Sequence, residues 1–143
     1  MAAFVKYQCF VEHLAEKVHN LGADTLKIAL TNTAPNVATH TVRADIAEIA
    51  AGNGYTAGGN TAAVSTSAQT AGVYKLTLAD PATWTAAGGT IGPFRYAVLY
   101  NDTPTSPIDP LIGYWDYGSS ITLQVGETFT VDLDQANGVL TIT

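Results

Sequence analysis

Cysteine and basic residues are the scarcest features of this sequence. A single cysteine, Cys9, cannot form an internal disulfide, which excludes a disulfide-stapled scaffold and fits a product of a reducing cytoplasm. There are 6 basic residues against 12 acidic ones, a net charge of −6, and after Asp80 the only basic residue is Arg95. Because a phosphate-binding surface needs the opposite sign, we expect no nucleic-acid partner.

Long apolar runs and alternating helices are also missing. No run approaches the roughly 20 apolar residues that a membrane span requires, and the first residues lack the pattern of a secretion signal, so we expect a soluble chain without a membrane partner. Without helices between strands, parallel βαβ units are excluded. At 143 residues, 47% of them apolar, the sequence predicts a single domain over residues 1–143 with one good core.

Residues typical of reactive sites are present without the spacing that such sites need. The glycine-rich Gly52–Asn60 lacks the Gly-Lys-Ser/Thr ending of a phosphate-binding loop, and Cys9 has no flanking base. His13 and His19 are too far apart in sequence to share one helical face as a chelating pair. We therefore expect no catalytic residue, no cofactor, no metal and no enzymatic activity.

Carboxylates in the last third of the chain leave three interpretations open. Asp132 and Asp134 are two positions apart and therefore share one face of a predicted strand, and other acidic residues occur in the same part of the sequence. These acidic residues could form a solvated acidic face, a cation site, or a carboxylate pair for glycoside hydrolysis. Arg95 is predicted to pair with a carboxylate such as Asp116, since an unpaired buried guanidinium is costly.

The clearest structural signal is β. Phe94–Tyr100 is apolar on both alternating faces, which predicts a central strand covered on both sides. Leu111–Trp115 predicts a second strand of the same kind, and Asn101–Pro110 is the proline-rich loop between them.

One amphipathic helix is predicted at the start of the chain, over Phe4–Leu21. Its apolar residues recur at steps of three and four, and Gly22 is placed to end it. This predicts a division into an N-terminal helix over residues 1–22 and a β domain over residues 25–143. The helix packs on the sheet of its own domain or on a neighbouring subunit, with Phe4 and Val5 reaching outward.

Further alternating segments complete the predicted fold. We expect strands over Thr25–Thr31 and Tyr74–Leu78, an edge strand or an exposed, weakly packed ribbon within Asn60–Ala71, and a short helical turn within Ala44–Ala51. The last quarter predicts a three-stranded antiparallel meander, with strands at Ile121–Leu123, Phe129–Leu133 and Val139–Ile142. The fold class is mainly β: an antiparallel β-sandwich or flattened barrel with an N-terminal amphipathic helix.

Motifs along nearly the whole chain resemble a family of small structural proteins of tailed bacteriophages. The segments that carry the resemblance are Asp24–Thr31 with Pro35, Gly52–Gly59, Trp84–Tyr96, Tyr100–Thr103, Leu111–Gly118 and Gly126–Asp132. The resemblance implies a virion component, foremost a head decoration (cement) protein on the capsid exterior. It brings no catalytic residues with it.

The resemblance also implies the partners. They are the major capsid protein and further copies of this chain, with a homotrimer favoured, and the protein is made in the host cytoplasm. A tail-associated protein (tube, collar or fibre module) and a glycan-binding module using Tyr114, Trp115 and Tyr117 are the alternatives. The candidate interface residues are Phe4 and Val5, which precede the apolar stripe of the helix, together with Tyr7, Phe10, Tyr114, Trp115 and Tyr117, because aromatic residues are favoured at interfaces.

Overall fold

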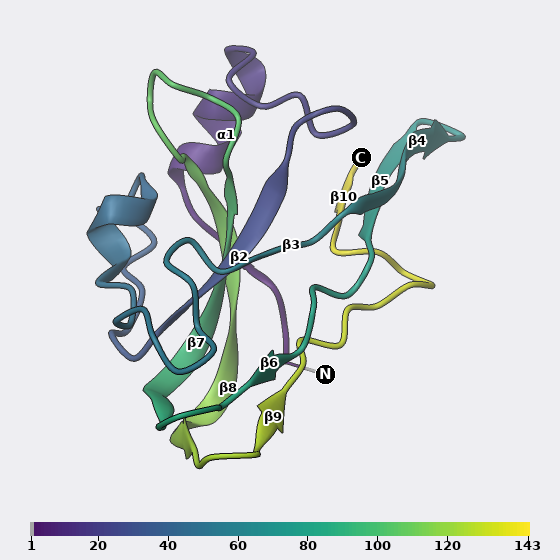
Figure 1. Ribbon diagram of the computed structural model, residues 1–143. Coiled ribbons are helices and arrows are strands. Elements are labelled where there is room, and N and C mark those ends of the chain that lie inside the picture. Colours follow the sequence, from purple (N-terminus) through teal and green to yellow (C-terminus); the bar gives the residue numbers. More distant parts are fainter. Residues whose placement is uncertain (1) are drawn as a thin grey trace.

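The largest unit of the fold is a five-stranded antiparallel sheet (Figure 1), seen in a computed structural model that describes residues 2–143. In spatial order its strands are β1 (Val5–Lys6), β8 (Leu111–Leu123), β7 (Ile91–Asn101), β2 (Leu26–Thr31) and β3 (Asn60–Thr61). The central strand predicted from the apolar pattern lies inside β7, at the middle of the sheet. Its expected neighbour begins β8, so both predictions are confirmed.

Two smaller antiparallel sheets cover one face of the large sheet, on the right in Figure 1. One consists of β10 (Leu140–Ile142), β5 (Val73–Leu78) and β4 (Val64–Thr70), and the other of β6 (Trp84–Thr85) and β9 (Thr128–Phe129). The fold is thus mainly β, antiparallel and sandwich-like, with one short α-helix near the N-terminus. This confirms the predicted fold class.

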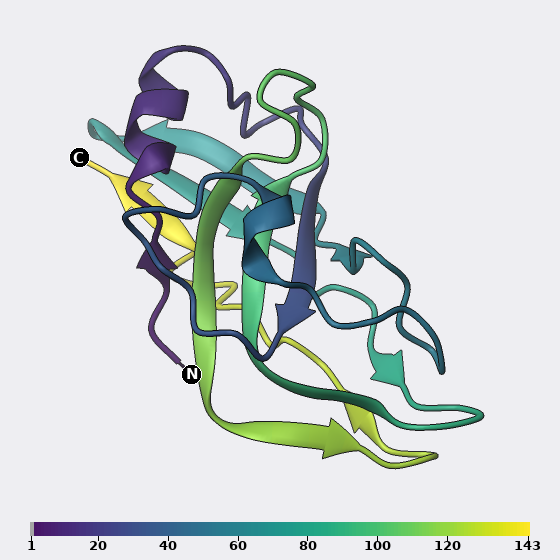
Figure 2. The ribbon, with the colours of Figure 1, turned by 90° about the vertical axis from the view of Figure 1, so that its left-hand side faces the viewer.

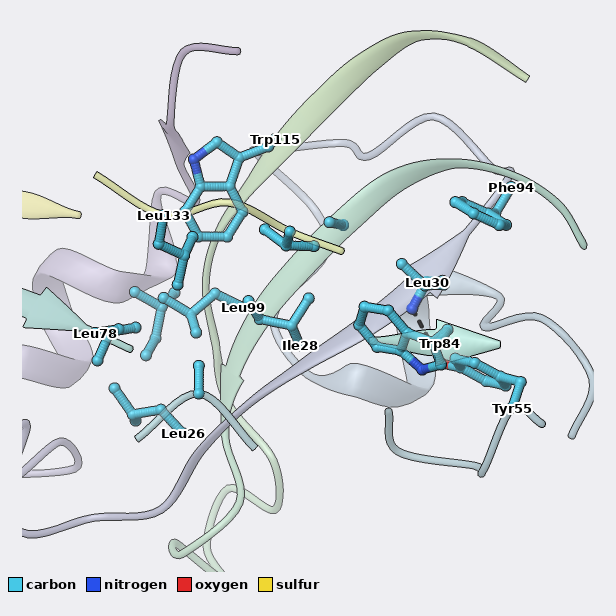
Figure 3. Packing of buried hydrophobic residues seen from close by; sticks show 14 of the residues in the cluster. Leu26, Ile28, Leu30, Tyr55, Leu78, Trp84, Phe94, Leu99, Trp115 and Leu133 are labelled. Atoms are coloured by element: carbon cyan, nitrogen blue, oxygen red, sulfur yellow. Dashed lines mark hydrogen bonds between the residues drawn. The ribbon is translucent and has the colours of Figure 1, made fainter. Parts of the chain in front are cut away.

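The larger apolar core fills the space between these layers. Ile28 from β2 and Leu99 from β7 are fully buried, and Figure 3 shows them facing Leu78 and Leu133 from the opposite layer. Burying each side chain of this size stabilises the fold by roughly 1.5–3 kcal/mol. Alternate side chains along β2 and β7 therefore form one apolar face of the large sheet, and this face packs against the smaller sheets.

The second face of the large sheet is covered as well. Val98 and Tyr100 from β7 and Ala29 from β2 form a smaller cluster with Ile46, which belongs to the 3-10 helix η1 (Arg43–Ile46). Figure 2 shows this helix in front of the sheet. β7 is therefore buried on both faces, as predicted. β2 was expected to be half-buried, and this expectation was wrong because the loop carrying η1 covers its second face.

The N-terminal helix is much shorter than predicted. Helix α1 spans only Cys9–Ala15, and the residues before it form β1, which pairs with β8 through Val5 opposite Tyr114. Lys17 adopts a positive φ of 67°, which ends the helical path well before Gly22. The predicted helix over Phe4–Leu21, and with it the division at residue 22, was wrong because tertiary pairing overrode the helical periodicity.

The three-stranded meander predicted for the last quarter does not form. The first of its segments is the end of the long strand β8, β9 pairs with β6 through Phe129 opposite Trp84, and β10 pairs with β5 through Leu140 opposite Leu76. Of the strand predicted over Phe129–Leu133 only its first residue is in a strand, because β9 spans Thr128–Phe129. The segments that do form strands pair elsewhere in the chain. Alternation fixes which face of a strand is apolar and does not choose its neighbour.

Smaller predictions have mixed outcomes. The exposed ribbon within Asn60–Ala71 contains β3 and the edge strand β4, as expected. The helical turn expected within Ala44–Ala51 occurs slightly earlier, as η1. In the glycine-rich turns, Gly59 has a φ of +71° and lies against the backbone of Ile28, so any side chain there would collide with β2.

Candidate functional site

Three of the seven candidate interface residues lie inside the protein. Tyr7 is 0% exposed, Phe10 is 3% exposed and Trp115 is 7% exposed, and each belongs to one of the two core clusters or packs within it. Burial raises the pKa of the Tyr7 hydroxyl well above its ordinary value. These three side chains therefore stabilise the fold of this chain and offer little surface to a partner.

The other four candidates lie at or near the surface. Phe4 does not reach outward as expected, because its half-buried ring packs on Trp115 with a centroid separation of 5.0 Å. Val5 on β1 and Tyr117 on β8 are exposed, and Tyr114 is half-buried. The exposed candidates are thus separated along the surface, one on each of two neighbouring strands.

The aromatic cluster on β8 is divided between the two faces of the sheet. Tyr114 packs against the smaller cluster, where its ring lies 5.7 Å from that of Tyr7, and it also lies 6.0 Å from the ring of Tyr96. Trp115 lies in the larger core on the opposite face. Because successive side chains alternate along a strand, Tyr114 lies on the opposite face from Trp115 and Tyr117, so the three aromatic residues expected to form one glycan platform are divided.

An apolar groove runs between α1 and β10. It has a volume of about 540 Å³, and its lining includes Phe4, Lys6, Phe10, Val11, Leu14, Val139, Leu140 and Ile142. Val11 is 54% exposed and Ile142 39% exposed on its rim. β1 and β10 are each the end strand of their sheet, so their outer edges also face this side of the molecule (Figure 2).

Two further hollows meet at Tyr117, whose ring is 56% exposed. One, of about 400 Å³, is lined in part by Arg95, Trp115, Thr130 and Asp132. The other, of about 470 Å³, is lined by residues that include Tyr117, Ile121, Glu127 and Phe129. The Tyr117 ring meets that of Phe129 edge to face, with a centroid separation of 5.9 Å, which holds it as a ridge between the hollows.

The predicted ion pair between Arg95 and Asp116 is present. Arg95 donates through Nε to Oδ1 at 2.7 Å and through Nη2 to Oδ2 at 2.9 Å, and the backbone N–H of Gly118 also donates to Asp116. These hydrogen bonds hold the pKa of Asp116 below its ordinary value. The pair is more exposed than the apolar neighbours of Arg95 suggested, because its side chains are 38% and 39% exposed.

A polar network that the sequence did not reveal fixes the loops over the smaller cluster. Glu48 accepts from the Tyr55 hydroxyl at 2.6 Å and from Arg43 at 2.9 Å, and Arg43 also donates to Asp109 at 3.0 Å. The Tyr55 hydroxyl in turn accepts from the backbone N–H of Leu30 at 3.0 Å, shown in Figure 3. Arg43, Glu48 and Tyr55 come from one stretch of the chain, and the fold brings that stretch to Asp109 and Leu30, which are distant in sequence.

His13 and His19 are closer than their spacing implied. The chain turns back after α1 and brings the two rings to a centroid separation of 6.0 Å. The Nδ1 atom of His19 lies 3.1 Å from the amide nitrogen of Asn101, which also donates to Asp24 at 2.6 Å. Burial, and then the neighbouring His13, lower the pKa of His19 to about 4.

The acidic residues of the last third do not converge on a single site. Asp109 belongs to the network around Arg43, and Asp134 accepts hydrogen bonds from Ala136 and Asn137 in a turn. Among residues 2–143 no three histidine, cysteine, aspartate or glutamate side chains are grouped so as to hold a metal ion. None of the described helices has the length and apolar content that a membrane crossing requires.

Comparison with protein-family models, curated proteins and solved structures found no match to this chain. Its function is therefore inferred from its own motifs and surfaces.

Proposed function

We propose that this protein is a capsid decoration (cement) protein of a tailed bacteriophage, bound to the outside of the head. The motifs from Asp24 to Asp132 supply the family resemblance. The observation that carries the proposal is the apolar groove between α1 and β10, with Val11 exposed on one side and Ile142 on the other. Exposed apolar side chains gathered at a groove mark a protein–protein contact.

The proposed mechanism is stapling. Copies of the chain, as homotrimers, sit over junctions between major capsid protein subunits and add contact area that resists pressure from inside the head. Each contact is modest, but many copies on one particle multiply the effect through avidity. The activity is non-enzymatic and needs no cofactor.

The charge of the chain suits this position. A net charge of −6, all of it contributed after residue 79, repels packaged DNA and favours the outer surface of the shell. Binding then relies on apolar contact and on basic groups of the capsid.

Electron microscopy of particles from the phage that encodes the chain tests the proposal. We expect density matching this fold on the outside of the head in hundreds of copies. A handful of copies at the tail would replace the proposal with the tail-associated alternative, and particles that lack the chain would overturn both.

Variants of the groove provide a biochemical test of the same proposal. Val11→Ser should weaken co-sedimentation with particles stripped of the protein, because Val11 lies on the groove. Val125→Ser is the matched control, since Val125 is 64% exposed and lies outside the groove. Equal binding by both variants would remove the groove from the proposed interface.

A further inference from the structure

The ridge at Tyr117 is a second surface, separate from the groove between α1 and β10. Its ring stands between the hollow that contains Asp132 and the hollow that contains Glu127. The Phe129 ring packs against the buried side of the Tyr117 ring and fixes its orientation. The other side of the Tyr117 ring faces solvent. A fixed, half-exposed aromatic ring with a carboxylate in the hollow on either side is an arrangement suited to a cation.

The charges around the ridge are negative. Arg95 also lines one hollow, but its charge is met by the bidentate contact with Asp116. The Asp132 carboxylate is exposed and makes no hydrogen bond or ion pair to any residue within 2–143. The Glu127 carboxylate accepts, in that range, only from the backbone N–H of Gln124 at 2.7 Å. Two carboxylates therefore remain without a cationic partner beside the ring.

The strand that carries the ridge is open to an approaching chain. β1 covers the outer side of β8 only at Gly113 and Tyr114, and beyond that point no described strand pairs on this side. Gly118, next to Tyr117, has a φ of +101° and nothing within 4 Å of the position of a Cβ. A side chain from another protein therefore reaches the ring without displacing any part of this one.

We infer that the Tyr117 ridge binds a basic side chain, arginine or lysine, of a partner protein. The cation lies over the exposed ring while Asp132 or Glu127 receives its N–H groups. The inference deepens the proposed function, on which it rests for the identity of the partner as the capsid. A neutral saccharide also stacks on tyrosine, but it leaves the two carboxylates without a charge partner, so the charges favour the cation.

Nuclear magnetic resonance with a matched pair of small probes tests the chemistry of this site. Nα-acetyl-arginine amide should shift the resonances of Tyr117, Thr130 and Asp132, whereas Nα-acetyl-citrulline amide, its neutral isostere, should not. Asp132→Asn should weaken arginine binding about twofold to fivefold, and Asp102→Asn, an exposed carboxylate on a distant loop, should not. Equal shifts from both probes, shifts elsewhere, or shifts with maltose alone would overturn the inference.

Particle binding separates this inference from the proposed function. Tyr117→Ala and Asp132→Asn should each weaken co-sedimentation with stripped particles, and the loss should shrink at high salt. If wild-type protein binds and both variants bind equally well, the basic-side-chain site is wrong while the decoration role stands. If wild-type protein does not bind particles at all, the decoration role itself fails, whatever the probes show.

Discussion

The two halves of β8 show how one strand serves both the fold and its surface. From Leu111 to Trp115 the strand pairs with β7, and at Gly113 and Tyr114 also with β1, and it is largely buried. From Asp116 onward it is paired only with β7 among the described strands, and Tyr117 to Ser120 are exposed. The first half therefore carries stability and the second half is free for binding. Substitutions in the two halves should separate these properties.

The largest effect is expected in the buried half. Ile112 is 0% exposed, so Ile112→Ala should lower the free energy of unfolding by about 2–5 kcal/mol, through lost apolar burial and the cavity left behind. Tyr117→Ala, on the exposed half, should cost about 1 kcal/mol or less. Urea denaturation followed by circular dichroism measures both, and similar costs would contradict the division of β8.

A pH-dependent loss of stability should arise at the buried histidine. The pKa of His19 is about 4 in the folded chain against an ordinary 6.5, so the fold holds the neutral form. The neutral His19 contributes about 3 kcal/mol to the free energy of unfolding. This contribution is complete above pH 6.5 and is lost as the pH falls toward 4. Unfolding free energies measured between pH 7 and 4 check this.

Two histidine variants show which residue causes the change of unfolding free energy with pH. His19→Gln should flatten the pH dependence over this range. His40→Gln should leave it unchanged, because His40 lies on the loop before η1 and is only half-buried. A slope that survives His19→Gln would place the titrating group elsewhere.

A pair of tyrosine variants compares satisfied and unsatisfied hydroxyls. Tyr55→Phe removes the acceptor of the buried Leu30 N–H and a donor to Glu48, and should cost about 1–3 kcal/mol. The buried hydroxyl of Tyr7 has no partner within residues 2–143, so Tyr7→Phe should be neutral or stabilising. Thermal unfolding of both variants gives the comparison, and a greater loss for Tyr7→Phe would contradict it.

The smallest effect is expected at the exposed ion pair. A double-mutant cycle with Arg95→Ala and Asp116→Ala should give a weak coupling that decreases as salt is added, because solvent screens the pair. A coupling insensitive to salt would mean that the pair is more shielded than its exposure indicates.

The sequence predicted those parts of the fold in which local pattern and tertiary environment agree. Phe94–Tyr100 is apolar on both faces and became the centre of the sheet, and Arg95 found the carboxylate expected of it. The pattern misled where partners had to be chosen. Tyr7 and Phe10 follow a helical spacing, yet β1 pairing and the positive φ of Lys17 confine the helix to a short segment.

The candidate site was less predictable than the fold, because it depends on contacts between distant segments. Tyr117 is a candidate interface residue because of its aromatic ring. Nothing in the neighbouring sequence indicates that Phe129 supports this ring or that Asp132 and Glu127 lie beside it. The network around Arg43 depends likewise on a distant partner, Asp109, which nothing local indicates. Residue type indicates what a side chain can contact, and only the fold decides whether it does.

The stability of the head measures the central claim most directly. Particles stripped of this protein should release their DNA at a lower temperature than intact particles, and adding back the wild-type chain should restore the difference. Val11→Ser should restore less than wild type at the same concentration. Stripped and intact particles that release DNA at the same temperature would contradict the account.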